Sequence, residues 1–382
     1  MCCWCSCLEC IHNIPPLNLL FLHFSDPAAL PAGEGASGPV SMASISVPNP
    51  VPPATEDAEN IRKAVQGWGT DEKALIEILG HRTAAQRAEI AMAYEGLYNE
   101  TLLDRLHSEL SGDFRVSKSP TTGGPSDLFV AGDVSCQSAM MLWTMDPAAR
   151  DAKLAHKALK KKGDRHVWVL IEVACASSPD HLVAVRKAYR AAYSASLEED
   201  VAACQLYSDP LRNFLVRLVT AYRYSGELVD GELATAEAAE LHGAVVAGKQ
   251  LLQVGDVVRI LGSRSKPQLR ATFERFRQEY GMAFDDVLEE RRSDQLAAML
   301  KTAVWCLVSP EKHFAEVTRS SIVGLGTDEE SLTRAIVSRA EIDMQKVKEE
   351  YKVMYRKTVT SDVNGDTSDY YNGILLTLVG PE

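Results

Sequence analysis

No stretch of the 382-residue sequence comes near the roughly eighteen continuous apolar residues that a bilayer-spanning helix needs. The best apolar run, LNLLFLHF at residues 17–24, is far too short, so we expect a soluble chain. The sequence also lacks a positive charge balance, because 40 Lys and Arg face 52 Asp and Glu and the net charge is −12. This charge disfavours unaided binding to nucleic acid or to an anionic membrane. Either partner would require a cation in between.

Cysteine is sparse outside the first ten residues. Five of the nine cysteines lie in MCCWCSCLEC, with no histidine at zinc-finger spacing beside them. The other four are isolated: Cys136, Cys175, Cys204 and Cys306. Isolated cysteines fit a reducing compartment rather than a disulfide framework. Residues 1–41 also lack the cationic start of a secretory signal. We interpret them either as a cysteine-rich arm that could be acylated or as sequence upstream of a start at Met42, and their structureless composition favours the second.

Alternation of apolar and polar residues, which is typical of half-buried strands, is almost absent. Apolar residues instead recur at helical spacing, as in Ala74, Leu75, Ile78 and Leu79. A hydrophobic content of 46% is enough to bury a sizeable core. We therefore predict an all-α protein with almost no sheet.

Internal repeats organise the chain. Four segments follow one template, in which a turn containing a small residue or arginine leads into a helix that ends on an aromatic residue. Twelve positions separate the two anchors in every copy: Arg82 and Tyr94, Ser177 and Tyr189, Arg264 and Phe276, Arg339 and Tyr351. The steps between copies are 95, 87 and 75 residues, enough for about five short helices each.

The repeats set the predicted domain boundaries: 42–145, 146–228, 229–309 and 310–382. The first repeat is long because of a Gly-, Ser- and Pro-rich stretch at residues 116–137. Without these 22 residues the step of 95 becomes 73, and SGDFR would run into SAMMLWTMDP as one amphipathic helix. We interpret the stretch as a retained intron or isoform segment, since it begins with Val and ends with Gln as an in-frame intron could. Transcripts that always contain it would contradict this.

One short glycine loop occurs twice, as GWGTDE at residues 67–72 and as GLGTDE at residues 324–329. Glycines two positions apart allow positive φ and can direct several carbonyl oxygens at one place, as a hard cation requires. Thr70 and Thr327 suit the N-cap of the following helix, and Glu330 would complete a capping box in the second copy. Taken alone, such a loop is most often a plain helix connection.

A distant carboxylate accompanies both loops. Glu109 follows Gly69 by forty residues, and Asp366 follows Gly326 by forty residues. Each acid lies in a Gly- or Ser-containing stretch that we predict to be a loop after two further helices. Calcium takes about six to eight oxygens from carbonyls, carboxylates and water. Loop carbonyls with one bidentate carboxylate would leave positions open for the phosphate oxygens of a ligand.

With its twin loops, distant acids and fourfold repeat, the chain resembles an annexin, most of all a plant annexin, over about residues 53–382 apart from the insert. The resemblance implies a right-handed array of four five-helix repeats forming a curved disc, whose convex face carries calcium loops that dock on acidic phospholipid. It implies carbonyl and carboxylate ligands at two calcium sites, in repeats 1 and 4: Val65, Gly67, Gly69 and Glu109; Ile322, Gly324, Gly326 and Asp366. Weaker secondary sites would pair Thr70 with Glu72 and Thr327 with Glu329.

Repeats 2 and 3 depart from this pattern. LKKKGDRHVW and VAGKQLLQVGD stand in place of the loops, and Arg291 lies about where the third acid would be. We expect these repeats to bind no calcium and to serve as scaffold. The basic run from Lys157 to Arg165 could touch lipid headgroups, although such runs are more often solvated helix ends.

Trp68 and Leu325 lie between the paired glycines of the two loops. If the loop carbonyls face an ion, these side chains project from the loop tip, and tryptophan prefers the membrane interface. We therefore predict that both residues contact the membrane. Packing of Trp68 in an ordinary core is the alternative.

An enzyme on the same scaffold is the rival interpretation. His81 matches a histidine proposed in plant annexins as a haem or peroxidase ligand, and Cys175 and Cys306 match cysteines proposed to be redox-active. DVNG, residues 362–365, fits part of a nucleotide-binding pattern. One histidine does not establish a haem pocket, cysteines in apolar helices do not favour thiolates, and no phosphate loop accompanies DVNG.

We accordingly predict a non-enzymatic, calcium-dependent, peripheral membrane-binding protein of the cytoplasm that acts in calcium signalling, membrane traffic or stress response. Its cofactor is Ca²⁺ and its partner is the acidic phospholipid membrane. The resemblance leaves actin as a candidate partner. No nucleic acid is expected, and on membranes the protein would be a monomer or weak oligomer. The alternative is an annexin scaffold with peroxidase-like redox activity or GTP or ATP hydrolysis.

Overall fold

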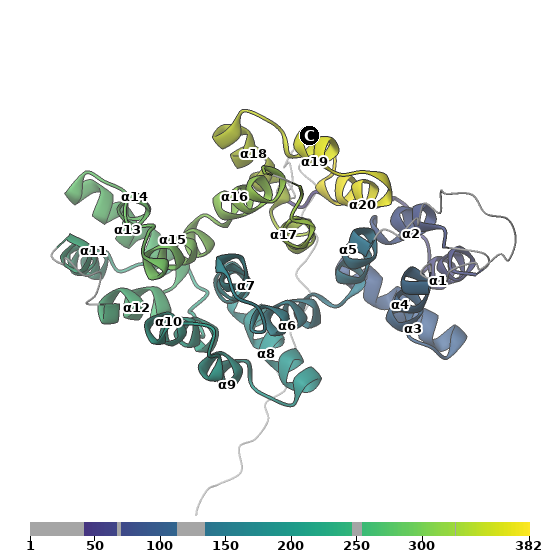
Figure 1. The fold of residues 1–382 in the computed structure, drawn as a ribbon, viewed down its shortest axis with the longest axis horizontal. Coiled ribbons are helices and arrows are strands. Elements are labelled where there is room, and N and C mark those ends of the chain that lie inside the picture. The colour runs from purple at the N-terminus through teal and green to yellow at the C-terminus, as the bar shows by residue number, and fades with distance from the viewer. Residues whose placement is uncertain (1–41, 67–69, 113–133, 247–253, 325) are drawn as a thin grey trace, which may run out of the picture. The chain divides into compact units, whose positions relative to one another are not determined.

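The computed structural model describes residues 42–66, 70–112, 134–246, 254–324 and 326–382, all of which belong to one compact unit. Across these ranges the chain forms twenty α-helices and no strand, which confirms the predicted all-α class. In chain order the helices make four groups of five (Figure 1).

The first two groups hold helices α1 to α10: α1 (Ala54–Ala64), α2 (Glu72–Leu79), α3 (Ala84–Tyr98), α4 (Leu102–Gly112), α5 (Val134–Thr144), α6 (Pro147–Ala158), α7 (Asp164–Cys175), α8 (Pro179–Tyr193), α9 (Leu197–Ala203) and α10 (Asp209–Thr220). The last two groups hold helices α11 to α20: α11 (Gly231–Val246), α12 (Val254–Ser263), α13 (Lys266–Tyr280), α14 (Phe284–Glu289), α15 (Gln295–Val308), α16 (Pro310–Ile322), α17 (Glu329–Arg339), α18 (Met344–Tyr355), α19 (Val359–Asp366) and α20 (Asp369–Val379).

The third helix of each group carries the repeated template and packs against the first helix of its group. The aromatic anchors are fully buried: Tyr94, Tyr189, Phe276 and Tyr351. The sequence predicted that the helices end at these anchors. Instead, each helix continues for one more turn to a second aromatic residue. The two rings, four residues apart, contact each other at a tilt, with centroids 4.8 Å apart for Tyr94 and Tyr98 and 5.0 Å apart for Tyr351 and Tyr355. Such a pair stabilises the last turn of a helix.

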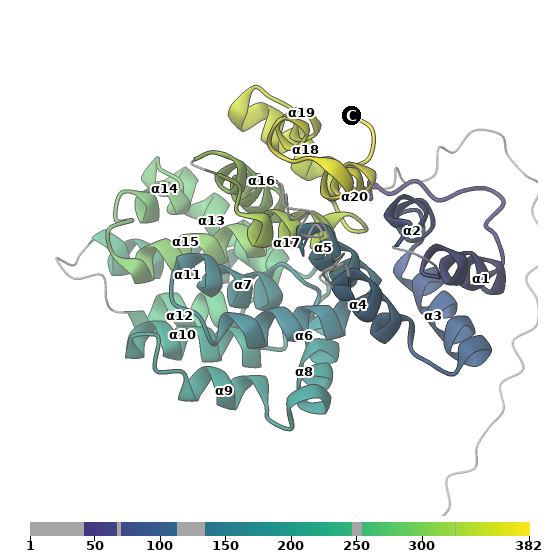
Figure 2. The same ribbon diagram turned by 45° about the vertical axis from the view of Figure 1, so that its right-hand side comes forward.

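The groups interlock in two pairs. Helices α2 and α5 of the first group pack against α20 and α17 of the fourth, while α7 and α10 of the second pack against α15 and α12 of the third. Figures 1 and 2 both show α20, in yellow, beside α2, in purple. Helices from the two ends of the sequence therefore share one core.

An extended segment that starts at Met42 joins the first and fourth groups. The Ser44 N–H donates to the Ala340 carbonyl at 2.8 Å, and the Met42 carbonyl accepts from the Gln345 N–H at 3.1 Å. The Ser46 carbonyl is bonded to His81 Nδ1 at 2.7 Å. These bonds fix the segment across two groups.

The segments that flank the predicted insert form two helices that pack against each other. Helix α4 ends at Gly112 and α5 begins at Val134, so the last four residues of the predicted insert already lie in α5, where Cys136 is buried. The prediction of one continuous helix concerns the chain without residues 116–137, so it stays a prediction.

No single helix in the described ranges is long and apolar enough to cross a membrane. The pair α7 and α8 meets the length and composition test when the two are taken together, although the pair is bent by 120°.

Candidate calcium loops

The loop of the fourth repeat begins where α16 ends. Ile322 is the last residue of this helix, and its carbonyl belongs to the final turn, in which carbonyls have no intrahelical donor. Gly324 and Gly326 adopt φ values of 151° and 86°, which a side chain would disfavour. The Asp328 N–H donates to the Ser321 carbonyl at 2.8 Å and closes the loop. Both glycines therefore have the backbone freedom that the predicted loop needs.

Asp366, the last residue of α19, lies next to this loop. The Thr327 hydroxyl donates to Asp366 Oδ2 at 2.6 Å and also lies 3.2 Å from the Asp366 carbonyl oxygen. The forty-residue spacing thus brings a carboxylate to the end of the glycine loop. Backbone carbonyls with one carboxylate form an all-oxygen donor set, which is the chemistry that calcium prefers.

The corresponding elements of the first repeat also meet. Val65, directly after α1, is buried, and its carbonyl accepts from Arg105 Nη2 at 2.9 Å. The same Nη2 lies 2.8 Å from Glu109 Oε1. Arg105 and Glu109 are one turn apart on α4, so a single guanidinium connects the Val65 carbonyl with the distant acid. Gly67, Trp68, Gly69 and, in the fourth repeat, Leu325 lie outside the described residues.

Both acids lie on helices rather than in loops, contrary to the sequence prediction. Glu109 is inside α4 and Asp366 ends α19. Three residues before each acid stands a fully buried apolar side chain, Leu106 and Val363 respectively. This anchor fixes the turn that carries the carboxylate.

The predicted helix caps are wrong by one residue. Asp71 and Asp328, not Thr70 and Thr327, cap α2 and α17, since their side chains accept from the Ala74 and Ser331 N–H groups at 2.9 and 3.1 Å. A carboxylate is favoured at the positive end of a helix. The Thr327 hydroxyl is thereby left to bind Asp366.

The predicted capping box of Glu330 is also absent. Its carboxylate instead accepts from Lys161 at 2.9 Å and lies 3.3 Å from Lys157. The secondary-site residues Glu72 and Glu329 are the first residues of α2 and α17, directly after the capping aspartates. Their proposed role with Thr70 and Thr327 stays a prediction.

The basic run of the second repeat packs on the loop of the fourth. Arg165 forms an ion pair with Asp328, and its guanidinium also lies 3.3 Å from the Ser320 carbonyl oxygen. Burial alone would raise the pKa of Asp328, but the Ser331 N–H and Arg165 outweigh burial and lower it. Sequence reasoning missed this contact. The four-residue spacing of Lys157, Lys161 and Arg165 is the signal that could have indicated one shared face.

Metal-binding clusters of three or more His, Cys, Asp or Glu side chains do not occur in the part of the chain that the structure describes. A loop site built mainly from backbone carbonyls does not require such a cluster. In the third repeat, residues 247–253 of the degenerate loop lie outside the described residues.

The residues of the rival enzymatic interpretation have other surroundings. His81 is half-buried, with one ring nitrogen bonded to Ser46 and the other 3.9 Å from Glu77. This polar corner differs from the apolar pocket that a haem ligand needs. Asp362, the first residue of DVNG, is bound by Arg319, by the Tyr351 hydroxyl at 2.6 Å and by Lys357 at 3.2 Å.

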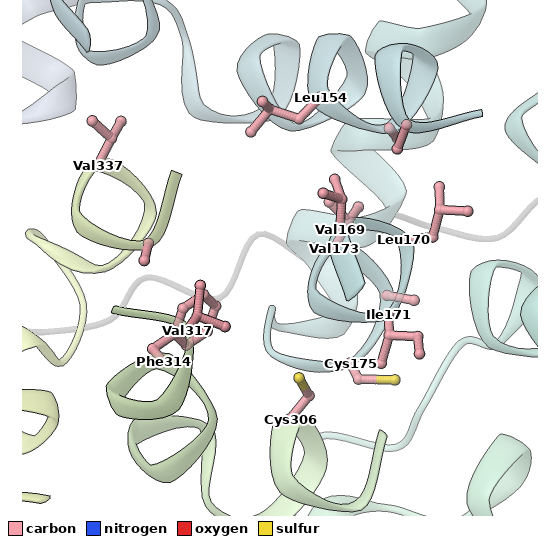
Figure 3. Packing of buried hydrophobic residues seen from close by; sticks show 14 of the residues in the cluster. Leu154, Val169, Leu170, Ile171, Val173, Cys175, Cys306, Phe314, Val317 and Val337 are labelled. Atoms are coloured by element: carbon pink, nitrogen blue, oxygen red, sulfur yellow. The ribbon is translucent and has the colours of Figure 1, made fainter. Parts of the chain in front are cut away.

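Cys175 and Cys306 are fully buried, and Figure 3 shows both side chains in the core between α7 and α15. Burial raises the pKa of the Cys175 thiol, and it raises the pKa of the Cys306 thiol strongly. Both sulfurs are therefore held as neutral thiols, whereas thiol reactivity requires the thiolate. Their surroundings are those of small core residues.

Comparison with known proteins gives one consistent result. The family model described as Annexin matches residues 56–117, 150–217, 238–302 and 313–378. The chain is similar to Annexin D3 of Arabidopsis thaliana, with 43% identity over 344 residues that cover 89% of this chain and 99% of the relative. Among solved structures it resembles annexin III, with a TM-score of 0.76, 29% identity and coverage of 89% of this chain and 97% of that chain. It also resembles a calcium-bound annexin (Sm)1, with a TM-score of 0.69, 26% identity and coverage of 86% and 90%.

Proposed function

The chain belongs to the annexin family, and on that premise we propose that it binds acidic phospholipid membranes in a calcium-dependent manner through the loops of repeats 1 and 4. Annexins bind calcium and are known for calcium-dependent phospholipid binding. The observation that carries the proposal is the contact between Thr327 and Asp366, which joins the glycine loop to its distant acid.

In repeat 4 the calcium ligands would be the carbonyls of Ile322, Gly324 and Gly326 and the Asp366 carboxylate. A carboxylate has about four lone-pair sites, so Asp366 can accept from Thr327 and still hold a cation. Bound calcium would supply positive charge between lipid phosphates and a protein of net charge −12. In repeat 1 the corresponding ligands would be Val65, Gly67, Gly69 and Glu109.

The proposed setting is the cytoplasm, with attachment to membranes when calcium rises during signalling, membrane traffic or stress. We further propose that the protein is not an enzyme and acts as a monomer or weak oligomer, with actin as a candidate further partner. The buried thiols of Cys175 and Cys306 and the polar surroundings of His81 support the non-enzymatic assignment.

Neutral replacements of the two acids test the function. Glu109→Gln and Asp366→Asn keep the size of each side chain but remove its charge and its ability to coordinate calcium through two carboxylate oxygens. Each change should raise the calcium concentration needed for vesicle pelleting on the order of tenfold, and the double change should nearly abolish pelleting. Sedimentation with phosphatidylserine vesicles across a calcium titration measures this.

Circular dichroism in EDTA provides the control, because the variants should keep the helix content of the wild type. Glu330→Gln is a matched variant: it removes a carboxylate close to the repeat 4 loop that is paired with Lys161 and belongs to neither proposed site. It should pellet like the wild type. Wild-type pelleting by the double variant would disprove the site assignment.

The proposal also includes contact between apolar side chains of the two loops and the membrane interface. Trp68 and Leu325 stand between the paired glycines, and we assign them to the interfacial layer. Trp68→Ala should lower vesicle affinity about tenfold, as expected for losing a contact of about 1 to 2 kcal/mol. Thermal stability without lipid should change little. A large loss of stability with unchanged vesicle affinity would place Trp68 in the core instead.

A further inference from the structure

Arg105 connects the two groups that would hold calcium in the first repeat. Its Nη2 atom lies 2.9 Å from the Val65 carbonyl oxygen and 2.8 Å from Glu109 Oε1. The Arg105 and Glu109 side chains are about three-quarters buried, at 23% and 25% exposure, so water screens this pair less than a surface pair. The positive charge of the guanidinium thus lies between the same two oxygen ligands that a cation would share.

The fourth repeat has the opposite charge at this place. The residue 257 positions after Arg105, in the same relation to its loop, is Asp362. Its carboxylate is held by Arg319, Tyr351 and Lys357. Within the described residues Asp366 has no ion-pair partner, and the Thr327 hydroxyl is bonded to it. The two loops have nearly the same sequence but differ in the group that engages the acid.

Two buried polar atoms of the first repeat lack hydrogen-bond partners among the described residues. Thr70 occupies the place of Thr327, yet its buried Oγ1 has no hydrogen-bond partner among the described residues. Arg105 Nε is likewise buried without a partner there. Burial of an unpaired polar atom is unfavourable. Release of Arg105 toward solvent would hydrate its guanidinium and leave Glu109 free to engage the loop.

We propose that Arg105 is an internal competitor of calcium and sets the calcium affinity of the repeat 1 loop below that of the repeat 4 loop. This inference rests on the proposed function, because it takes Val65 and Glu109 as calcium ligands. The Val65 carbonyl and Glu109 would have to release the guanidinium before they could hold calcium, whereas Asp366 has no competing cation among the described residues. Repeat 4 therefore loads first as calcium rises, and repeat 1 responds at higher calcium.

The test isolates the repeat 1 loop and omits lipid. In full-length Asp366→Asn protein the repeat 4 loop is weakened, so the change in isothermal titration with calcium chloride on adding a repeat 1 substitution reports binding in repeat 1. Adding Arg105→Gln should increase this affinity at least about fivefold, the change expected for removing a competing ion pair worth about 1 kcal/mol. Thermal unfolding gives a second readout: in EDTA the Arg105→Gln variant should melt slightly lower, and calcium should raise its melting temperature more than that of its parent.

Lys63→Gln in the same background is the matched control. It removes an equal charge two residues from Val65, but Lys63 is exposed and bonded to Asn60 rather than to Glu109. It should change the calcium affinity less than about twofold. Unchanged or weaker binding in Arg105→Gln, with binding abolished by Glu109→Gln, would overturn the inference and leave the proposed site intact. Absence of calcium binding in all of these variants would overturn the repeat 1 site itself, and the inference with it.

Discussion

At the scale of single residues, Thr70 and Thr327 occupy the same place in nearly identical loops but have different surroundings. Thr327 donates to Asp366 at 2.6 Å, whereas Thr70 Oγ1 has no partner among the described residues. The loop sequence could not distinguish them, since both loops read Gly-x-Gly-Thr-Asp-Glu. The acids differ as well: Glu109 is engaged by Arg105, which lies 35 positions after Thr70, whereas Asp366 accepts from Thr327. Two copies of one motif therefore need not have the same side-chain partners.

These two threonines give a prediction without calcium. Thr327→Val should lower the free energy of unfolding by about 1.5 to 3 kcal/mol, because it removes a hydrogen bond to a charged group. Thr70→Val removes a hydroxyl without a described partner and should change it by less than about 0.5 kcal/mol or stabilise the protein. Urea unfolding of both variants in EDTA measures the difference. An equal loss in both would contradict the assignment of different partners.

At the scale of elements, the sequence predicts best what local patterns encode. The register of the third helix of each repeat followed from an arginine or serine anchor and an aromatic anchor 12 positions apart, and all four aromatic anchors are fully buried. This worked because helical periodicity and burial are linked within one turn or two. The extra turn up to Tyr98 and its equivalents depends on a second aromatic residue four positions on, which the 12-position template does not contain.

Side-chain contacts at helix ends and between repeats are harder to predict from the sequence than the helices themselves. Threonine is a good cap, so the sequence favours Thr70 and Thr327 as caps of α2 and α17, but the aspartate next to each forms the cap. When two neighbouring residues can both cap a helix, the contacts that each makes elsewhere decide which one does. Thr327 binds Asp366, and the adjacent aspartate caps the helix. The basic run of repeat 2 is typical of a solvated helix end, yet Lys161 and Arg165 pair with Glu330 and Asp328 at the start of α17. A local pattern does not reveal which distant carboxylate will neutralise it.

At the scale of the whole molecule, one buried carboxylate joins repeats 2 and 4. Glu172 of α7 accepts from the Arg334 guanidinium of α17 at 2.8 Å and lies 2.8 Å from His313 Nε2 of α16. All three side chains are almost completely buried. A buried ion pair is costly to break by removing one partner, since the other charge stays buried and uncompensated.

This cluster gives a pH dependence with a defined sign. Burial alone would raise the pKa of Glu172, but Arg334 and His313 outweigh burial and lower the pKa from 4.5 to about 2. A carboxyl group whose pKa is lower in the folded state binds fewer protons there than in the unfolded state. Its stabilisation is therefore fully present above about pH 4.5 and is lost as the pH falls toward 2.

Glu172→Gln should separate this group from the many other carboxylates of the chain. At neutral pH the variant should lose about 3 to 5 kcal/mol of unfolding free energy, because Arg334 keeps its charge in a buried place without a counterion. Between pH 4.5 and 2 the variant should lose less further stability than the wild type, since the proton uptake linked to Glu172 is gone. Urea unfolding at a series of pH values measures both effects, and Glu95→Gln, which changes an exposed glutamate of α3, should keep the wild-type profile. Parallel pH profiles for Glu172→Gln and the wild type would mean that other carboxylates control acid unfolding. The cluster would then connect repeats 2 and 4 without making that connection sensitive to pH.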